Sequence, residues 1–257
     1  MKQPHLIMKS KRPLTVAKKR DTASILSLQT LLVVLVFCMA LALLIFVTRK
    51  IFYHAEQGFD EAVFLYLSHQ VTPVHTAIMQ VFTFLGSHFF LIPAWFVVFG
   101  YYGFIKKNNW ELAKAVIIAL TNLLLMFGLK YYFSRLRPPV PLLKEVPGFS
   151  FPSGHAYMSL IFFGLLIYNM YRATGKKQLQ WPVVFILAAI IFMVGLSRVY
   201  LRLHYASDVI SGYCFSLLSL IILLWILRQV EKTPAAGIPC HAGIPNKKGY
   251  PAMKKVD

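Results

Sequence analysis

Apolar residues along this chain are gathered into runs of roughly 20, the length that a helix needs to cross the hydrocarbon core of a bilayer. Short polar segments separate the runs. We expect membrane-spanning helices over residues 25–47, 76–105, 111–133, 154–171, 181–200 and 208–227. The pattern therefore predicts an all-α, polytopic membrane protein in which six transmembrane helices form a bundle.

The ends of the chain differ in composition from the apolar runs. Residues 1–24 are polar and basic, and residues 229–257 are rich in Pro, Gly and Lys. Few residues in either segment could join a packed core. We expect a basic N-terminal tail (1–24), a transmembrane domain (25–228) and a disordered basic C-terminal tail (229–257).

The loop over residues 48–74 is acidic, since it carries Glu56, Asp60 and Glu61. Part of this loop, from about Phe59 to Leu67, is apolar enough to lie along the membrane surface.

The overall composition supports a membrane protein and argues against nucleic-acid binding. Of the 257 residues, 58% are hydrophobic and 14% charged, with a mean hydropathy of +0.62. A soluble domain of this size is less apolar. The net charge of +18 comes mainly from the tails and from short loops such as Lys106-Lys107 and Lys176-Lys177. An even number of spans places these segments on one side, which we expect to be the cytoplasmic side of a plasma membrane.

The clearest chemical signal is Phe151-Pro152-Ser153-Gly154-His155, where a Pro-rich polar segment meets an apolar run. Ser153 is a natural N-cap, Gly154 lets the backbone approach a ligand closely, and His155 falls in the first helical turn. A helix N-terminus carries unpaired N–H groups and partial positive charge, which suit a phosphate.

Basic residues precede this segment at the end of the third predicted span. Lys130 and Arg137 are seven residues apart, so they share a face if the helix continues, and together they could hold a dianion. Arginine adds a bidentate geometry that matches phosphate oxygens. Arg135 is equally consistent with a loop charge and is not assigned to the site.

A second polar group follows the fifth predicted span. His204 and Asp208 are four residues apart, so the carboxylate can fix one imidazole nitrogen while the other stays free to attack. Arg198 can add a phosphate contact. Two crossings separate this segment from the loop that precedes His155, so both groups meet at one surface, which we expect to be the outer one. The residues alone predict a site that handles phosphate there.

Three segments resemble the signature motifs of the type-2 phosphatidic acid phosphatase family, which includes vanadium haloperoxidases and glucose-6-phosphatase. They are Lys130-x6-Arg137-Pro138, Pro152-Ser153-Gly154-His155 and Ser197-Arg198-x5-His204-x3-Asp208. Thr83-Phe84-Leu85-Gly86 is also similar to the membrane-bound bacterial members. A haloperoxidase is not favoured, because this chain consists mostly of membrane spans.

The resemblance implies a role for each site residue. His204 is expected to be the nucleophile that forms a phosphohistidine, with Asp208 orienting it. His155 is expected to protonate the leaving oxygen and then to activate water. The phosphate-binding residues implied are Lys130, Arg137, Ser153, Gly154 and Arg198. No metal or cofactor is implied.

The activity implied is hydrolysis of a lipid phosphate monoester or diphosphate such as undecaprenyl diphosphate, phosphatidylglycerol phosphate or phosphatidate. The expected partners are a phospholipid or prenyl-phosphate substrate and the membrane, and no nucleic acid. A phosphotransferase that passes the phosphoryl group to another lipid or a sugar would use the same residues. A transporter or scaffold would not need them. Lys254-Lys255 also resembles a retrieval signal of the endoplasmic reticulum.

Overall fold

The computed structural model describes residues 17–143, 147–172 and 177–232, and over these ranges the chain is helical with no strand. The elements in chain order are α1 (Ala17–Phe52), α2 (Gly58–Ser68), α3 (Pro73–Leu85), α4 (His88–Gly100), a π-helix (Tyr101–Ile105), α5 (Asn109–Phe133), α6 (Gly154–Arg172), α7 (Lys177–Tyr200) and α8 (Ala206–Lys232).

Six of the described helices form the bundle that the apolar runs predict. Five segments are long and apolar enough to cross a membrane, and they belong to α1, to α4 with the π-helix, to α5, to α7 and to α8. The sixth helix is α6, which has 19 residues and contacts α4, α5, α7 and α8. The expectation of an all-α polytopic bundle is confirmed.

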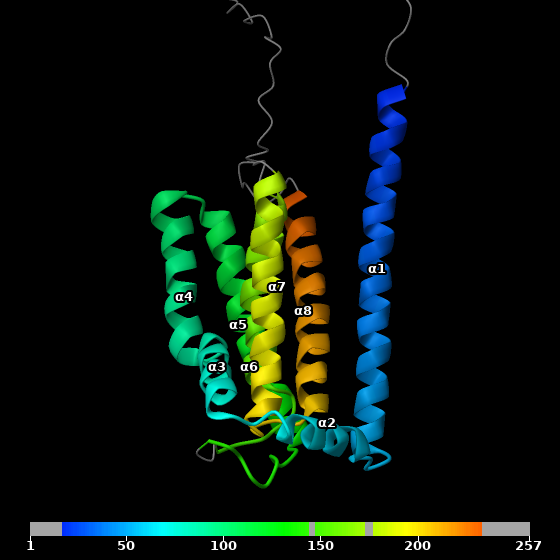
Figure 1. The fold of residues 1–257 in the computed structure, drawn as a ribbon. Helices are drawn as coiled ribbons and strands as arrows, with labels where there is room; N and C mark the ends of the chain where they lie inside the picture. Colours follow the sequence, from blue (N-terminus) through cyan, green and yellow to red (C-terminus); the bar gives the residue numbers. More distant parts are fainter. Residues whose placement is uncertain (1–16, 144–146, 173–176, 233–257) are drawn as a thin grey trace, which may run out of the picture.

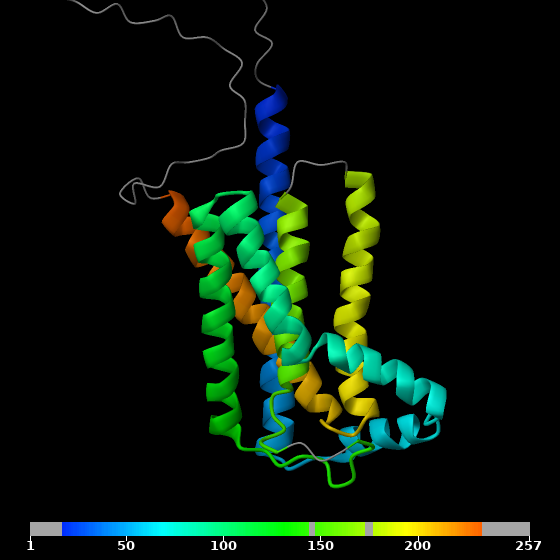
Figure 2. The same ribbon diagram turned by 90° about the vertical axis from the view of Figure 1, so that its left-hand side faces the viewer.

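The single span predicted over residues 76–105 is wrong, because two helices meet there. Helix α3 ends at Leu85 and α4 begins at His88. A Cβ atom on Gly86 would lie 3.4 Å from the Cβ of His155 and would overlap Val194, so the backbone at the break packs tightly against α6 and α7. Helix α3 then contacts α7, while α4 continues along α5. Figure 2 shows α3 inclined away from the direction of the long helices.

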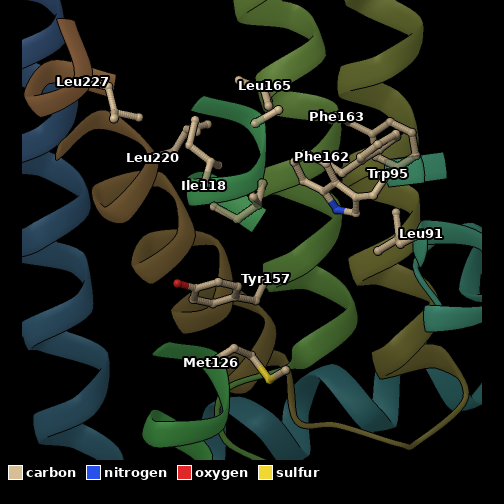
Figure 3. Packing of buried hydrophobic residues seen from close by; sticks show 12 residues of the cluster. Leu91, Trp95, Ile118, Met126, Tyr157, Phe162, Phe163, Leu165, Leu220 and Leu227 are labelled. Atoms are coloured by element: carbon tan, nitrogen blue, oxygen red, sulfur yellow. The ribbon is translucent and has the colours of Figure 1, made fainter. Parts of the chain in front are cut away.

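Helix α6 supplies the centre of the core. Its buried aromatic and aliphatic side chains meet residues of α4, α5 and α8, as Figure 3 shows. The labelled members of this cluster are Leu91, Trp95, Ile118, Met126, Tyr157, Phe162, Phe163, Leu165, Leu220 and Leu227. Because α6 is enclosed by its neighbours, the position of its N-terminal end is fixed by four other helices.

Helix α2 coincides with the apolar part of the first loop and lies across one end of the bundle (Figure 1). Val63, Phe64 and Leu67 pack against a buried cluster that includes Val199 and Val209. This helix therefore covers the junction between the end of α7 and the start of α8.

Both ends of the described chain lie at the opposite end of the bundle from α2 (Figure 1). Helix α1 begins at Ala17, inside the segment assigned to the N-terminal tail, and α8 continues to Lys232. The rest of the two predicted tails, residues 1–16 and 233–257, lies outside the described residues.

Candidate active site

The candidate residues lie at the end of the bundle that carries α2. Lys130 is in the last turn of α5, Arg198 is in the last turn of α7, and Asp208 is in the first turn of α8. The others are in the connecting segments or at the start of α6: Arg137, Ser153, Gly154, His155 and His204. Hydrogen bonds link several of these residues, among them Arg137 with His204 and Ser153 with Asp208.

A tight turn after α7 fixes the spacing between Arg198 and His204. The amides of Leu203 and His204 both donate to the carbonyl of Arg198, at 3.0 and 3.2 Å. Arg202 adopts a left-handed conformation with φ of 53°, which reverses the chain within this turn. This turn therefore holds His204 next to the last turn of α7.

His204 is 2% exposed, and its two ring nitrogens have different surroundings. Nδ1 lies 3.3 Å from the hydroxyl of Ser150 and 3.7 Å from Oδ2 of Asp208. Ser150 donates a hydrogen bond to that same carboxylate oxygen, and the amide of Tyr205 donates to it at 3.0 Å. On the other side of the ring, Nε2 lies 3.3 Å from a nitrogen of Arg137.

Burial lowers the pKa of His204 well below its usual value, and the nearby cations Arg198, Arg137 and Lys130 lower it further. The imidazole is therefore neutral near pH 7. A neutral ring whose Nδ1 carries the proton has its lone pair on Nε2. Burial also lowers the pKa of Arg137, an effect that the charge of Asp208 opposes.

Lys130, Arg137 and Arg198 are cations without a carboxylate within 4.0 Å among the described residues. Lys130 donates to the carbonyl of Phe149 at 2.8 Å. Arg137 donates to the carbonyls of Gly148 and Leu203, and Arg198 donates to the hydroxyl of Thr83. Three converging cations held only by neutral groups make this region suited to an anion.

Two buried polar groups beside these cations lack a hydrogen-bond partner among the described residues. They are the hydroxyl of Ser153 and Nε of Arg198. Buried polar groups are almost always paired, so both are available to a ligand. The amide of Tyr157 donates to the carbonyl of Ser153, which places Ser153 at the N-cap of α6. The amides in the first turn of a helix have no partner within the helix, so those of α6 are suited to bind an anion.

Gly154 permits a close approach between α5 and α6. A Cβ atom there would lie 3.4 Å from Sδ of Met126 and 3.5 Å from Cε of Lys130. These are ordinary van der Waals distances, so α5 and α6 already pack closely at this position.

His155 faces a cavity of about 420 Å³ that runs between α4 and α5. Its ring makes no hydrogen bond within the part of the chain that the structure describes. Lys130 and Gly154 line the same end of the cavity. The remaining lining is almost entirely apolar, from residues such as Leu91, Ile92, Phe96, Ala119, Leu123 and Phe127. The cavity therefore extends from the polar end of the bundle along the apolar sides of α4 and α5.

The structure adds Arg135 and Ser150 to the residues that sequence reasoning selected. Arg135 donates to Oδ1 of Asp208 at 2.6 Å and to Oδ2 of Asp60 at 3.0 Å. One signal for this contact was present in the sequence. Asp60 has the helical spacing of Val63, Phe64 and Leu67, so a carboxylate shares the apolar face of α2. Ser150 had no comparable signal.

Comparisons with known proteins find similar phosphatases. Residues 110–232 match the family model of the PAP2 superfamily. The curated protein phosphatidylglycerophosphatase B of Bacillus subtilis is 29% identical over 180 residues, which is 70% of this chain and 88% of the relative. A crystal structure described as the first transmembrane PAP2 type phosphatidylglycerolphosphate phosphatase from Bacillus subtilis superposes with a TM-score of 0.69. It is 25% identical, and the match covers 76% of this chain and 98% of the solved one.

Proposed function

From these matches we propose that the chain is a member of the PAP2 superfamily and an integral membrane lipid phosphatase. Its substrate is a lipid phosphate monoester or diphosphate, and the reaction passes through a phosphohistidine. The observation that carries the proposal is the placement of His204, whose Nε2 faces Arg137 while Nδ1 faces Ser150 and Asp208.

Phosphatidylglycerol phosphate is the first substrate to test, because both relatives are named for it. Undecaprenyl diphosphate and phosphatidate are the other lipid candidates. The apolar cavity between α4 and α5 supports a lipid over a soluble phosphate ester. A tail lying in the cavity would place its head group beside His155 and Lys130.

In the first step, Nε2 of His204 attacks phosphorus, so that an N–P bond forms as the P–O bond to the lipid breaks. His155 gives its proton to the leaving oxygen. In the second step, His155 takes a proton from water, the water oxygen attacks phosphorus, and the N–P bond breaks to release orthophosphate. His204 and His155 then return to their starting states. These steps need no metal ion or cofactor.

The phosphate oxygens would be bound by the cations and by the start of α6. Lys130, Arg137 and Arg198 would balance the negative charge that develops in the five-coordinate transition state. The hydroxyl of Ser153 and Nε of Arg198, which are buried without partners among the described residues, would donate to it. Gly154 lets the phosphate approach the first-turn amides of α6.

We also propose that the site lies on the outer face of the plasma membrane, with both termini in the cytoplasm. Support comes from the charges at the two ends of the bundle. The loop that joins the π-helix to α5 and carries Lys106 and Lys107 lies at the end that holds both chain ends, whereas α2, which carries Asp60 and Glu61, lies at the site end. Cytoplasmic segments of membrane proteins are enriched in Lys and Arg.

The test is phosphate release by the purified protein in detergent with EDTA. The substrates are phosphatidylglycerol phosphate, undecaprenyl diphosphate, phosphatidate and a soluble sugar phosphate. We expect release from a lipid phosphate, inhibition by vanadate, and loss of release in His204→Ala with an unchanged thermal unfolding midpoint. Phosphate release by purified His204→Ala would refute the mechanism. Transfer of radiolabel to an added acceptor lipid, with no free phosphate, would identify a phosphotransferase instead.

A further inference from the structure

Asp60 is a buried carboxylate on a helix that otherwise lies at the surface. It is 2% exposed, whereas its neighbour Glu61 is exposed. Figure 1 shows α2 across the end of the bundle, where it contacts both α7 and α8. Burying a carboxylate costs free energy unless cations and hydrogen-bond donors offset the loss of water. The partners of Asp60 therefore indicate its role.

The partners of Asp60 are the two residues that flank Asp208 in space. Oδ1 accepts the amide N–H of Ser207 at 2.9 Å, and Oδ2 accepts the hydroxyl of Ser207 at 2.6 Å. Oδ2 also accepts a hydrogen bond from Arg135 at 3.0 Å. Asp60 therefore fixes the first turn of α8 on one side and the guanidinium of Arg135 on the other.

Arg135 lies between two carboxylates. One terminal nitrogen binds Asp60, and the other binds Oδ1 of Asp208 at 2.6 Å and the hydroxyl of Ser207 at 2.8 Å. Its guanidinium also lies over the ring of Tyr205, 4.0 Å from the ring centroid. Because Oδ1 of Asp208 binds Arg135, the hydroxyl of Ser150 and the amide of Tyr205 donate to the other oxygen, Oδ2.

We propose that Asp60 is a positioning residue for the phosphatase site. Through Arg135 it sets the orientation of the Asp208 carboxylate, and so the orientation of His204. A helix at the membrane surface thus determines the geometry of the attacking imidazole. This inference rests on the proposed function, in which His204 is the nucleophile.

Removing the charge of Asp60 leaves Arg135 with a single carboxylate. The guanidinium can then turn towards Asp208 and take both of its oxygens, since a bidentate pair is the preferred geometry of arginine with a carboxylate. Oδ2 of Asp208 would leave Ser150, and the imidazole would lose its orientation. Asp60 contacts no part of the cavity, so substrate affinity should change little.

The apolar face of α2 offers a way to separate this role from a purely structural one. Val63, Phe64 and Leu67 dock the helix without Asp60. Asparagine has the shape of aspartate and can still accept the amide of Ser207, so Asp60→Asn removes mainly the charge that holds Arg135. Glu61→Gln makes the same change one residue away on the exposed side of the same helix, and it serves as the matched control.

The first experiment measures kcat and KM of the full-length protein with phosphatidylglycerol phosphate in detergent micelles. We expect Asp60→Asn to lower kcat about ten-fold or more, because misplacement of a reacting group by about 1 Å can cost about a hundred-fold. KM should stay within about two-fold, and Glu61→Gln should match the wild type. Equal kcat values for Asp60→Asn and Glu61→Gln would overturn the proposal, as would a change confined to KM.

A double-mutant cycle tests the path through Arg135. If Asp60 acts through Arg135, the double variant Asp60→Asn/Arg135→Gln has the same kcat as Arg135→Gln alone. If the loss of kcat in the double variant equals the product of the losses in the two single variants, Asp60 and Arg135 act independently, and the proposal is overturned. Should Asp60→Asn fail to fold, Arg135→Lys replaces it. Lysine presents one nitrogen and cannot span both carboxylates, so kcat should fall, and a wild-type kcat would refute the proposal.

A measurement without turnover separates this inference from the proposed function. Where the wild-type protein releases no phosphate from any substrate, the proposed function fails and hydrogen exchange decides the role of Asp60. We expect the amides of residues 201–209 to exchange faster in Asp60→Ala than in Glu61→Ala. Equal exchange in the two variants would refute the positioning role.

Discussion

Oδ2 of Asp208 lies 3.7 Å from Nδ1 of His204, which is too far for a direct hydrogen bond. The hydroxyl of Ser150 joins the two groups, because it donates to this carboxylate oxygen and lies 3.3 Å from the imidazole nitrogen. A hydroxyl can donate and accept at once, so Nδ1–H can donate to Ser150 while Ser150 donates to Asp208. The carboxylate therefore acts on the imidazole through a serine.

Replacing Ser150 by alanine is expected to lower kcat about ten-fold or more, since a hydrogen bond to a charged group contributes about 1.5–3 kcal/mol. KM should change little, because Ser150 does not line the cavity. The control is Ser216→Ala, which removes a buried hydroxyl that bonds only to carbonyls of its own helix. Steady-state kinetics with a lipid phosphate checks both variants. A wild-type kcat in Ser150→Ala would show that Asp208 reaches His204 without the serine.

Filling the cavity between α4 and α5 is expected to weaken binding of long lipid tails. Ala119 lines this cavity on α5, so Ala119→Trp places an indole where a tail would lie. Each buried methylene contributes about 0.8 kcal/mol, so displacing two of them should raise KM about ten-fold. Turnover of a short, soluble phosphate ester should be unchanged.

Leu124→Trp is the matched control for the cavity, because Leu124 is 72% exposed on the same helix and does not line it. Kinetics with long-chain and short-chain substrates compares the two variants. Equal KM values for the long-chain lipid in Ala119→Trp and Leu124→Trp would exclude the cavity as the binding site of the tail.

The lowered pKa of His204 predicts that the fold loses stability in acid. A histidine in an unfolded chain titrates near pH 6.5. Below this pH the unfolded chain therefore binds a proton at His204, whereas the folded protein does not. Stability therefore falls as the pH drops from about 7 to 5. His204→Gln removes this contribution and should lose less stability over the same range.

Thermal unfolding in detergent at several pH values measures this difference. His69→Gln is the control, because His69 is exposed at the end of α2, and it should follow the wild type. The prediction fails if His204→Gln and the wild type lose the same stability between pH 7 and 5.

Gly195 is expected to be needed for the contact between α7 and α8. A Cβ atom there would overlap the hydroxyl of Tyr213, which donates to the carbonyl of Ile191, and would lie 2.7 Å from Val209. Gly195→Ala should lower the free energy of unfolding by about 1–3 kcal/mol, as overpacking does in other cores. Gly128 on α5 has no atom within 4 Å of an added Cβ.

The same substitution at Gly128 should therefore leave stability unchanged or raise it by up to about 1 kcal/mol, since alanine favours the helix. Thermal unfolding of the two variants gives the comparison. Equal midpoints for Gly195→Ala and Gly128→Ala would show that the helices separate easily at Gly195.

Several features of this protein follow from local sequence alone. The apolar runs predict the long helices, because a helix in lipid must be apolar along about 20 residues. The four-residue spacing of His204 and Asp208 predicts their proximity, since the start of a helix brings such residues to one face. Ser153 at the start of an apolar run predicts the N-terminus of α6.

Other features depended on how the helices dock. The break at Gly86 is set by its contact with His155 and Val194, which no periodicity along residues 76–105 encodes. Arg135 meets Asp60 across 75 residues of sequence, and Ser150 meets Asp208 across 58.

The sequence by itself therefore determined most of the long helices, the end of the bundle at which the polar residues lie and the family that the motifs resemble. The tertiary structure decided that Arg135 binds Asp60 and Asp208 and that the hydroxyl of Ser150 lies between His204 and Asp208. The physical reason is the distance along the chain over which each kind of interaction acts. Helical periodicity fixes the positions of side chains within a turn or two, whereas an ion pair between helices depends on packing to within about 1 Å.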